Sequence, residues 1–278
     1  MAVLLMLLTG CGMARFAYNN GETLSYMWLD RYVNFTDEQR HRFKPELSRI
    51  FDWHRRSQLP AYIKLLEGAK ERVDRPATQI EVKADADRLR QRLLMIVESS
   101  LPAMAEVALS MQPDQLAHLQ NKFSDNNEDY RKDNLDGDIE QRQRARYRKA
   151  LKQAEHFFGN LDRDQKQRLR QLSDARPLNN ELVLQVRMRR QQEMLVLLRR
   201  MHAEKPSREE AIRRLRDYVI RSQDYFGNRE HEAHYRAHEA GTVRLITELI
   251  NGTNAAQKAH FKDTLQHWID DFERLTGR

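Results

Sequence analysis

The sequence of 278 residues has few of the residues that make tight turns or covalent cross-links, with 10 Gly, 7 Pro and a single Cys. One thiol cannot form an internal disulfide. So few Gly and Pro argue against a turn-rich β-sandwich and against a glycine-dependent phosphate-binding fold. A charged fraction of 32% excludes a multi-span membrane protein, and a hydrophobic fraction of 40% excludes a disordered chain.

Helical periodicity is present from residue 21 onward. Apolar residues recur every three or four positions in the segments 89–111, 147–158, 194–201 and 261–275. No stretch shows sustained alternation of apolar and polar residues, so we expect no sheet. The patterns predict an all-α fold, an elongated bundle of about nine or ten helices. Residues 21–278 form this helical domain, with a possible subdomain break near 134–138.

The charge pattern indicates a solvated surface. The net charge is +7, and Arg outnumbers Lys by 36 to 12. An Arg excess allows anionic partners, because the guanidinium group matches phosphates and carboxylates. Acidic residues are nearly as numerous and are interspersed with the basic ones. We therefore expect no nucleic-acid partner.

A short apolar run at residues 3–8 precedes the lone cysteine, Cys11. The run is too short to cross a bilayer, which needs about 20 residues. The Leu-Thr-Gly-Cys motif that ends at Cys11 resembles the bacterial lipobox. The resemblance implies that 1–10 are a lipoprotein signal peptide, that Cys11 carries a lipid anchor with acyl chains such as palmitate, and that 11–20 are a tether. No basic residue precedes the run, so we expect the true start to lie upstream.

The residue after the cysteine bears on localisation. Gly12 stands where an Asp would imply retention at the inner membrane. By resemblance to the lipoprotein class, the chain is expected at the outer membrane, lipid-anchored on the periplasmic face.

Four helix starts share one pattern. They lie at 36–39, 112–115, 162–165 and 254–257, and each ends in Gln. A basic residue follows each Gln at the third position, and a large apolar residue follows at the fourth. The pattern resembles the Leu-Thr-x-x-Gln helix starts of small periplasmic chaperones that hold unfolded clients. A capping box, in which the Gln side chain accepts the backbone N–H of the capping residue before the helix, also explains it.

Further segments extend a resemblance to nearly the whole chain. The segments 18–20, 28–32, 53–62 and 126–131, together with the lipobox, resemble an uncharacterised family of Gram-negative helical outer-membrane lipoproteins. The resemblance implies an anchor and a fold. It implies no activity and brings no catalytic residues.

An aromatic, acidic and basic group near the N-terminus supplies the candidate partner-binding residues. They are Trp28, Asp30, Tyr32, Trp53, His54, Arg55 and Tyr62. Aromatic residues with Arg often dominate binding interfaces. The alternative is a small core between adjacent helices, with Asp30 paired to a neighbouring Arg.

Three histidines are weak metal candidates. His231, His234 and His238 fall on one stripe of a helix and could hold Zn²⁺ or Cu²⁺. Their spacing is not that of the His-Glu-x-x-His motif, and a solvated polar stripe is the alternative. We expect no catalytic residues, no cofactor and no small-molecule substrate, and hence no enzyme.

These observations together predict a non-catalytic envelope lipoprotein. It would act as a periplasmic helical scaffold or protein-binding module, with the membrane and an envelope protein as partners. One alternative is a chaperone-like binder of unfolded clients. The other is a metal-handling protein or metal-dependent hydrolase that uses the stripe of His231.

Overall fold

The computed structural model describes residues 17–277, and the chain within this range is all-α, as predicted. It contains α3 (Gly21–Val33), α4 (Asp37–Trp53), α5 (Leu59–Arg72), α6 (Gln79–Ser110), α7 (Pro113–Asn134), α8 (Ile139–Phe158), α9 (Arg163–Asp174), α10 (Asn180–Glu204), α11 (Arg208–Gln223), α12 (Arg229–Asn251) and α13 (Ala255–Thr276). A π-helical turn, η2 (His54–Gln58), lies between α4 and α5, and a 3₁₀ turn, η3 (Tyr225–Gly227), lies between α11 and α12. The expected signal peptide and Cys11 lie outside the described residues.

Helix starts follow the local sequence. Thr36 and Asp162 accept the amide of the third helical residue of α4 and α9, and a Gln side chain returns the bond in each case. Thr78 and Asp138 form the same box at α6 and α8, which are two starts beyond the four in the pattern. Capping boxes therefore set the starts of these four helices.

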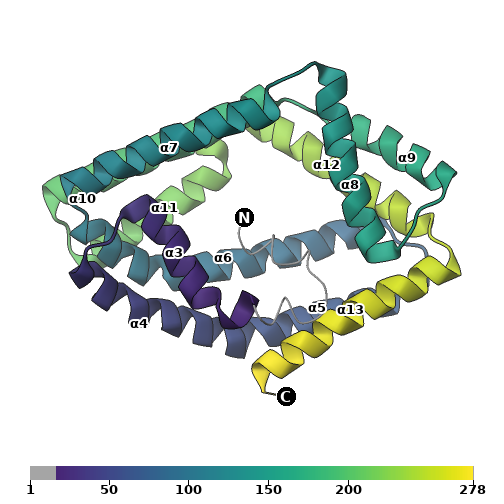
Figure 1. Cartoon of the computed structure of the whole chain (residues 1–278), viewed down its shortest axis with the longest axis horizontal. Helices are drawn as coiled ribbons and strands as arrows, with labels where there is room; N and C mark the ends of the chain where they lie inside the picture. Colours follow the sequence, from purple (N-terminus) through teal and green to yellow (C-terminus); the bar gives the residue numbers. More distant parts are fainter. Residues whose placement is uncertain (1–16, 278) are drawn as a thin grey trace.

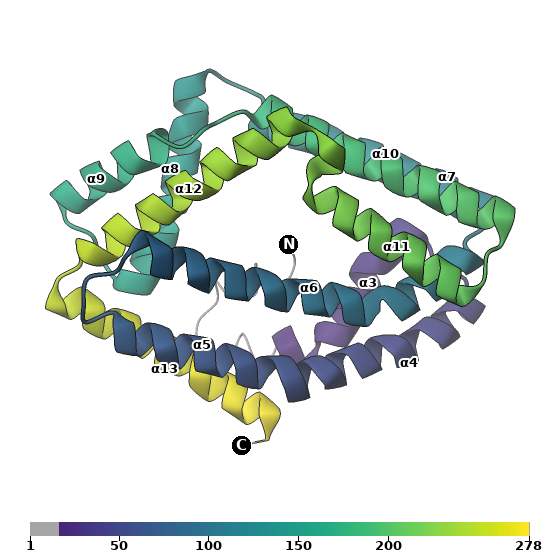
Figure 2. The same ribbon diagram turned by 180° about the vertical axis from the view of Figure 1, so that it is seen from behind.

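The helices lie in neighbouring pairs around a flattened frame (Figure 1). Helix α7 lies beside α10, α6 beside α11, and α5 beside α13, while α8 and α9 pack near α12 and α13. The same frame seen from behind shows α4, η2 and α5 following one another as one long rod (Figure 2). Thin apolar stripes explain this arrangement, because each helix can bury only a narrow face against one or two neighbours.

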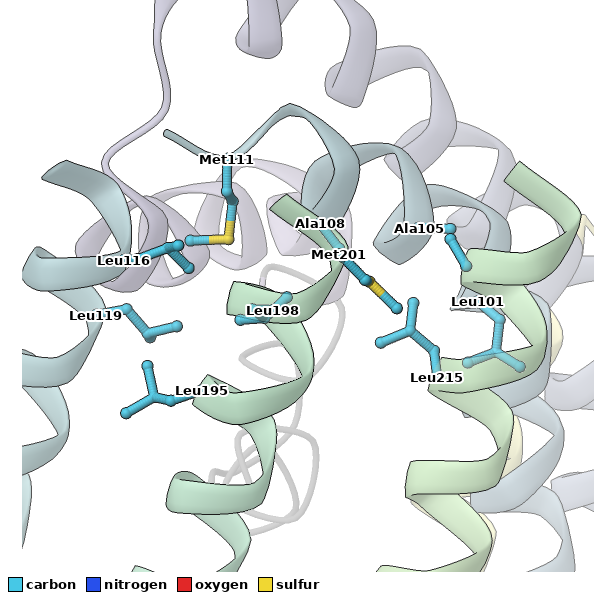
Figure 3. Packing of buried hydrophobic residues seen from close by; sticks show 11 residues of the cluster. Leu101, Ala105, Ala108, Met111, Leu116, Leu119, Leu195, Leu198, Met201 and Leu215 are labelled. Atoms are coloured by element: carbon cyan, nitrogen blue, oxygen red, sulfur yellow. The ribbon is translucent and has the colours of Figure 1, made fainter. Parts of the chain in front are cut away.

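The described residues bury three separate apolar clusters instead of one thick core. The largest joins α6, α7, α10 and α11 (Figure 3). Met201 and Ala211 are fully buried there, and Leu101 and Leu215 are nearly so. A second cluster joins α8, α9 and α12, and a third joins α4 and α6 with the residues after α3. The second and third clusters each lie beside one pair of the glutamine helix starts.

Helix α6 is long and apolar enough to cross a membrane by length and composition. Its most apolar 18-residue window has a mean hydropathy of 1.5, and 22% of that window is buried. The helix also supplies Leu101, Ala105 and Ala108 to the largest cluster. In this structure the C-terminal half of α6 therefore packs against α10 and α11.

Candidate functional site

The first glutamine pair consists of Gln39 at the start of α4 and Gln115 at the start of α7. Gln39 Nε2 donates to Gln115 Oε1 at 3.1 Å, and Gln115 Nε2 donates to Gln39 Oε1 at 2.7 Å. The two residues are 8% and 1% exposed. Buried amides need partners for both their oxygen and their nitrogen. Each amide here meets that need largely through the other.

The first pair also closes the ends of two preceding helices. Gln115 Nε2 donates to Asn34 O at 2.8 Å, just after α3, and Gln39 Nε2 donates to Ser110 O at 3.0 Å, at the end of α6. Gln39 Oε1 accepts the backbone N–H of Thr36 at 3.0 Å. Two side chains thus satisfy backbone groups from four helices, and they fix α3, α4, α6 and α7 relative to one another.

The second glutamine pair repeats this arrangement with Gln165 and Gln257. Gln165 Nε2 donates to Gln257 Oε1 at 2.8 Å, and the reverse bond measures 2.9 Å. Gln257 Nε2 donates to Asn160 O at 2.9 Å, and Gln165 Nε2 donates to Gly252 O at 2.8 Å. The second pair therefore joins the ends of α8 and α12 to the starts of α9 and α13.

At two of the four starts, the basic residue three positions after the Gln is a histidine, and both histidines make the same kind of contact. His118 Nε2 lies 3.0 Å from Arg31 O, and His260 Nε2 lies 3.3 Å from His156 O. Each histidine thus reaches the last turn of the helix that precedes the paired start. The sequence pattern predicted the caps. It did not predict that the four starts would meet two by two.

The predicted partner-binding residues separate into two groups. The group on α3 contains Trp28, Asp30 and Tyr32. The rings of Trp28 and Tyr32 lie 4.9 Å apart, and the Tyr32 hydroxyl accepts Asn126 Nδ2 of α7 at 3.1 Å. Asp30 Oδ1 accepts the backbone N–H of Phe35 at 2.9 Å, so it holds the turn after α3.

The second group lies at the π-helical turn and contains Trp53, His54, Arg55 and Tyr62. His54 Nδ1 lies 2.9 Å from the hydroxyl of Tyr18, and the Arg55 guanidinium lies 5.6 Å from the Tyr18 ring centre. The ring of Tyr62 packs between His54 and Phe272 of α13. Burial lowers the pKa of His54 to about 4 and raises that of Tyr18 to about 12. These contacts join the π-helical turn to Tyr18, to α5 and to α13.

The three candidate metal-binding histidines lie along α12. His231 is 8% exposed, and its backbone N–H donates to Asn228 Oδ1 at 3.0 Å. Burial is the main cause that lowers the pKa of His234 and His238. Within residues 17–277 no three side chains of His, Cys, Asp or Glu come close enough together to hold a metal ion.

Residues 31–228 match the model of a family of unknown function, DUF6279. The chain belongs to this family. The match begins within α3 and ends just before α12, so it includes the first glutamine pair and Gln165 but not Gln257. Comparisons with curated proteins and with solved structures found no match.

In this DUF6279 member, α3 carries an exposed apolar face. Leu24, Met27 and Trp28 are 45%, 52% and 49% exposed, and their spacing places them on one side of the helix. The other side of α3 packs against α4 and α7.

Proposed function

We propose that this protein is a non-catalytic envelope lipoprotein that binds a protein partner and is held to the periplasmic face of the outer membrane by Cys11. The exposed face of α3 carries the proposal. Two aliphatic side chains and a tryptophan lie together there about half exposed. Aromatic and apolar groups gathered on a surface are typical of protein-binding sites.

The first glutamine pair supports the face by fixing the helix that presents it. Gln115 donates to the carbonyls of Val33 and Asn34 at the end of α3, and Tyr32 is bound to α7 through Asn126. A rigid helix loses less conformational entropy on binding than a mobile one. These hydrogen bonds thus hold the exposed apolar face of α3 in a fixed orientation, which is the role expected of a scaffold.

The proposed anchor lies close to the same face in sequence. Gly21 lies ten positions after Cys11, and ten extended residues span at most about 36 Å. A lipid on Cys11 would therefore keep α3 near the membrane surface, where an envelope partner could reach it.

Site-specific photo-crosslinking in living cells tests the binding face. A photoreactive residue at Met27 should give a discrete crosslinked product. The same residue at Met188 on α10, which is 42% exposed, is the matched control and should give none. Equal products at both positions, or none at either, would contradict the proposal.

A separate experiment tests the anchor. Replacing Cys11 with Ser should abolish labelling with palmitate and release the chain from the membrane fraction. Labelling at the level of the unmodified protein would overturn the lipid anchor without bearing on the α3 face.

A chaperone-like function is the second candidate. The four helix starts resemble those of the small periplasmic chaperones, and in this chain they pair two by two through their Gln side chains. An aggregation assay with a model client decides it. Suppression at several-fold molar excess, reduced by Trp28→Ala, would favour this function, and no suppression would remove it.

A further inference from the structure

A basic groove runs between α5 and α6, away from both glutamine pairs and from the face of α3. The two helices follow each other through the turn at 73–78 and run side by side in opposite directions (Figure 2). The groove between them encloses ≈ 680 Å³. That volume falls within the range of small-molecule sites, about 300–1,000 Å³.

The charges of the groove do not balance. Its walls carry Lys64, Arg72, Arg88 and Arg92 against one carboxylate, Asp85. Asp85 accepts Arg72 Nη2 at 2.6 Å and Arg88 Nη1 at 2.7 Å, so both of its oxygens are engaged. Neither Lys64 nor Arg92 forms an ion pair with any residue of the described range. The lining therefore has a net charge of +3 and attracts anions.

The same groove has an apolar part beside these two cations. Pro60, Ala61 and Leu65 line it from α5, and Met95, which is 45% exposed, lines it from α6. Arg92 Nη1 lies 3.8 Å from the Met95 sulfur, so the cationic and apolar parts adjoin. A ligand that contacts both the cationic and the apolar part of the groove needs an anionic head and an apolar tail.

Two local features give the groove its shape. In the π-helical turn before α5, the Leu59 N–H donates to His54 O, five residues back, and the extra residue accommodates the ring of Pro60 at the groove wall. Farther along α5, Gly68 has no side chain. A Cβ there would lie 2.9 Å from Arg72 Nη1, so the glycine lets Arg72 lie close to the helix.

We propose that the groove binds a phosphate-bearing amphiphile. The phosphate would lie between Lys64 and Arg92, which both donate to it, and the acyl chain would lie along Leu65 and Met95. Charge-assisted bonds to phosphate supply specificity, and each buried methylene group adds affinity. Inorganic phosphate shares the chemistry of the head but lacks the tail.

Calorimetric titration distinguishes these ligands. The full chain carrying Cys11→Ser is used, so that no acyl chain of its own competes for the groove. Dodecyl phosphate, kept below its micellar concentration, should bind at least about tenfold more tightly than inorganic phosphate or the uncharged dodecyl maltoside. Equal affinity for dodecyl phosphate and either of the other two would overturn the proposal.

Charge-reversal variants locate the site. Lys64→Glu with Arg92→Glu should weaken dodecyl phosphate binding at least about tenfold. The matched control is Lys149→Glu with Lys152→Glu on α8, which makes the same change in net charge at two exposed positions and should stay within about twofold. Equal losses in the two double variants would mean non-specific attraction and would overturn the site.

A third variant keeps the test informative if charge reversal disturbs folding, which circular dichroism would reveal. Leu65→Ala should weaken the binding of dodecyl phosphate several-fold, because it removes part of the apolar wall. It should leave the binding of inorganic phosphate unchanged. An unchanged affinity for dodecyl phosphate in this variant would contradict the placement of the tail.

Discussion

The two glutamine pairs make nearly the same hydrogen bonds in different surroundings. Their reciprocal bonds are 3.1 and 2.7 Å in the first pair and 2.8 and 2.9 Å in the second. Gln115 of the first pair is 1% exposed, whereas Gln165 of the second is only half-buried. Water can replace a lost partner at the second pair far more easily than at the first. Burial, and not bond length, should therefore decide how much each pair stabilises the fold.

The largest expected effect comes from removing Gln115. Gln115→Ala removes both reciprocal bonds of the buried Gln39 and the donor to the carbonyls at the end of α3, and it should lower the free energy of unfolding by about 3 kcal/mol. Gln257→Ala breaks the corresponding bonds of the second pair, but water can reach Gln165, so about 1–2 kcal/mol is expected. Urea unfolding followed by circular dichroism measures both.

An exposed glutamine gives the control for this comparison. Gln153 lies on the exposed side of α8, and Gln153→Ala should change the free energy of unfolding by less than about 0.5 kcal/mol. Equal losses for Gln115→Ala and Gln257→Ala would contradict the argument from burial.

Acid should weaken the π-helical turn, which lies between Gln39 and Gln115 along the chain. His54 has a pKa lowered to about 4 by burial, whereas an unfolded histidine titrates near 6.5. Between these values the unfolded state binds more protons, so stability is complete above about pH 6.5 and falls as the pH drops toward 4. The expected loss is about 2 kcal/mol, reduced from the full linkage value because the site is not fully buried.

Unfolding of the His54→Gln variant checks this assignment. The loss of stability between pH 6.5 and 4 should be smaller in that variant than in the unmodified chain by about the same 2 kcal/mol. An identical pH profile in the two proteins would show that other groups cause the acid sensitivity.

A double-mutant cycle tests whether the pairs act as separate units. Gln39→Ala and Gln115→Ala should show a coupling energy of about 1 kcal/mol or more, because each variant removes the partner of the other. Gln39→Ala and Gln257→Ala belong to different pairs and should be additive within about 0.5 kcal/mol. A coupling energy between Gln39→Ala and Gln257→Ala would mean that the two glutamine pairs stabilise the fold cooperatively.

Features formed by neighbouring residues could be predicted from the sequence, whereas contacts between residues far apart in the chain could not. The caps at Thr36 and Asp162 were predictable because four consecutive residues form them. The pairing of Gln39 with Gln115 joins residues 76 positions apart, and that of Gln165 with Gln257 joins residues 92 apart. No local pattern carries that information, although an amide that recurs at four helix starts is a signal for it.

The π-helical turn and the groove were missed for related reasons. Pro60 within an otherwise helical run was the one local sign of the turn, since a proline there must displace or remove a helical hydrogen bond. The groove depends on how α5 and α6 align after the turn at 73–78, which brings Lys64 near Arg92. Among the predicted partner-binding residues, sequence proximity grouped Trp28 with His54, while the fold separates them onto α3 and the π-helical turn.

The smallest expected effect is a pH dependence of local stability that differs between the two glutamine pairs. Beside the second pair, burial and then the nearby His260 lower the pKa of His156, so the unfolded state binds more protons and protonation opposes the fold below about pH 6.5. Solvent screening at this partly exposed ring keeps the effect below about 0.5 kcal/mol. Hydrogen exchange can resolve it locally. After correction for the intrinsic rate, the Gly159 amide, which donates to Glu155 O, should exchange faster at pH 5 than at pH 7. The Asn34 amide at the matching position of the first pair should not, and equal acceleration at both would remove the distinction.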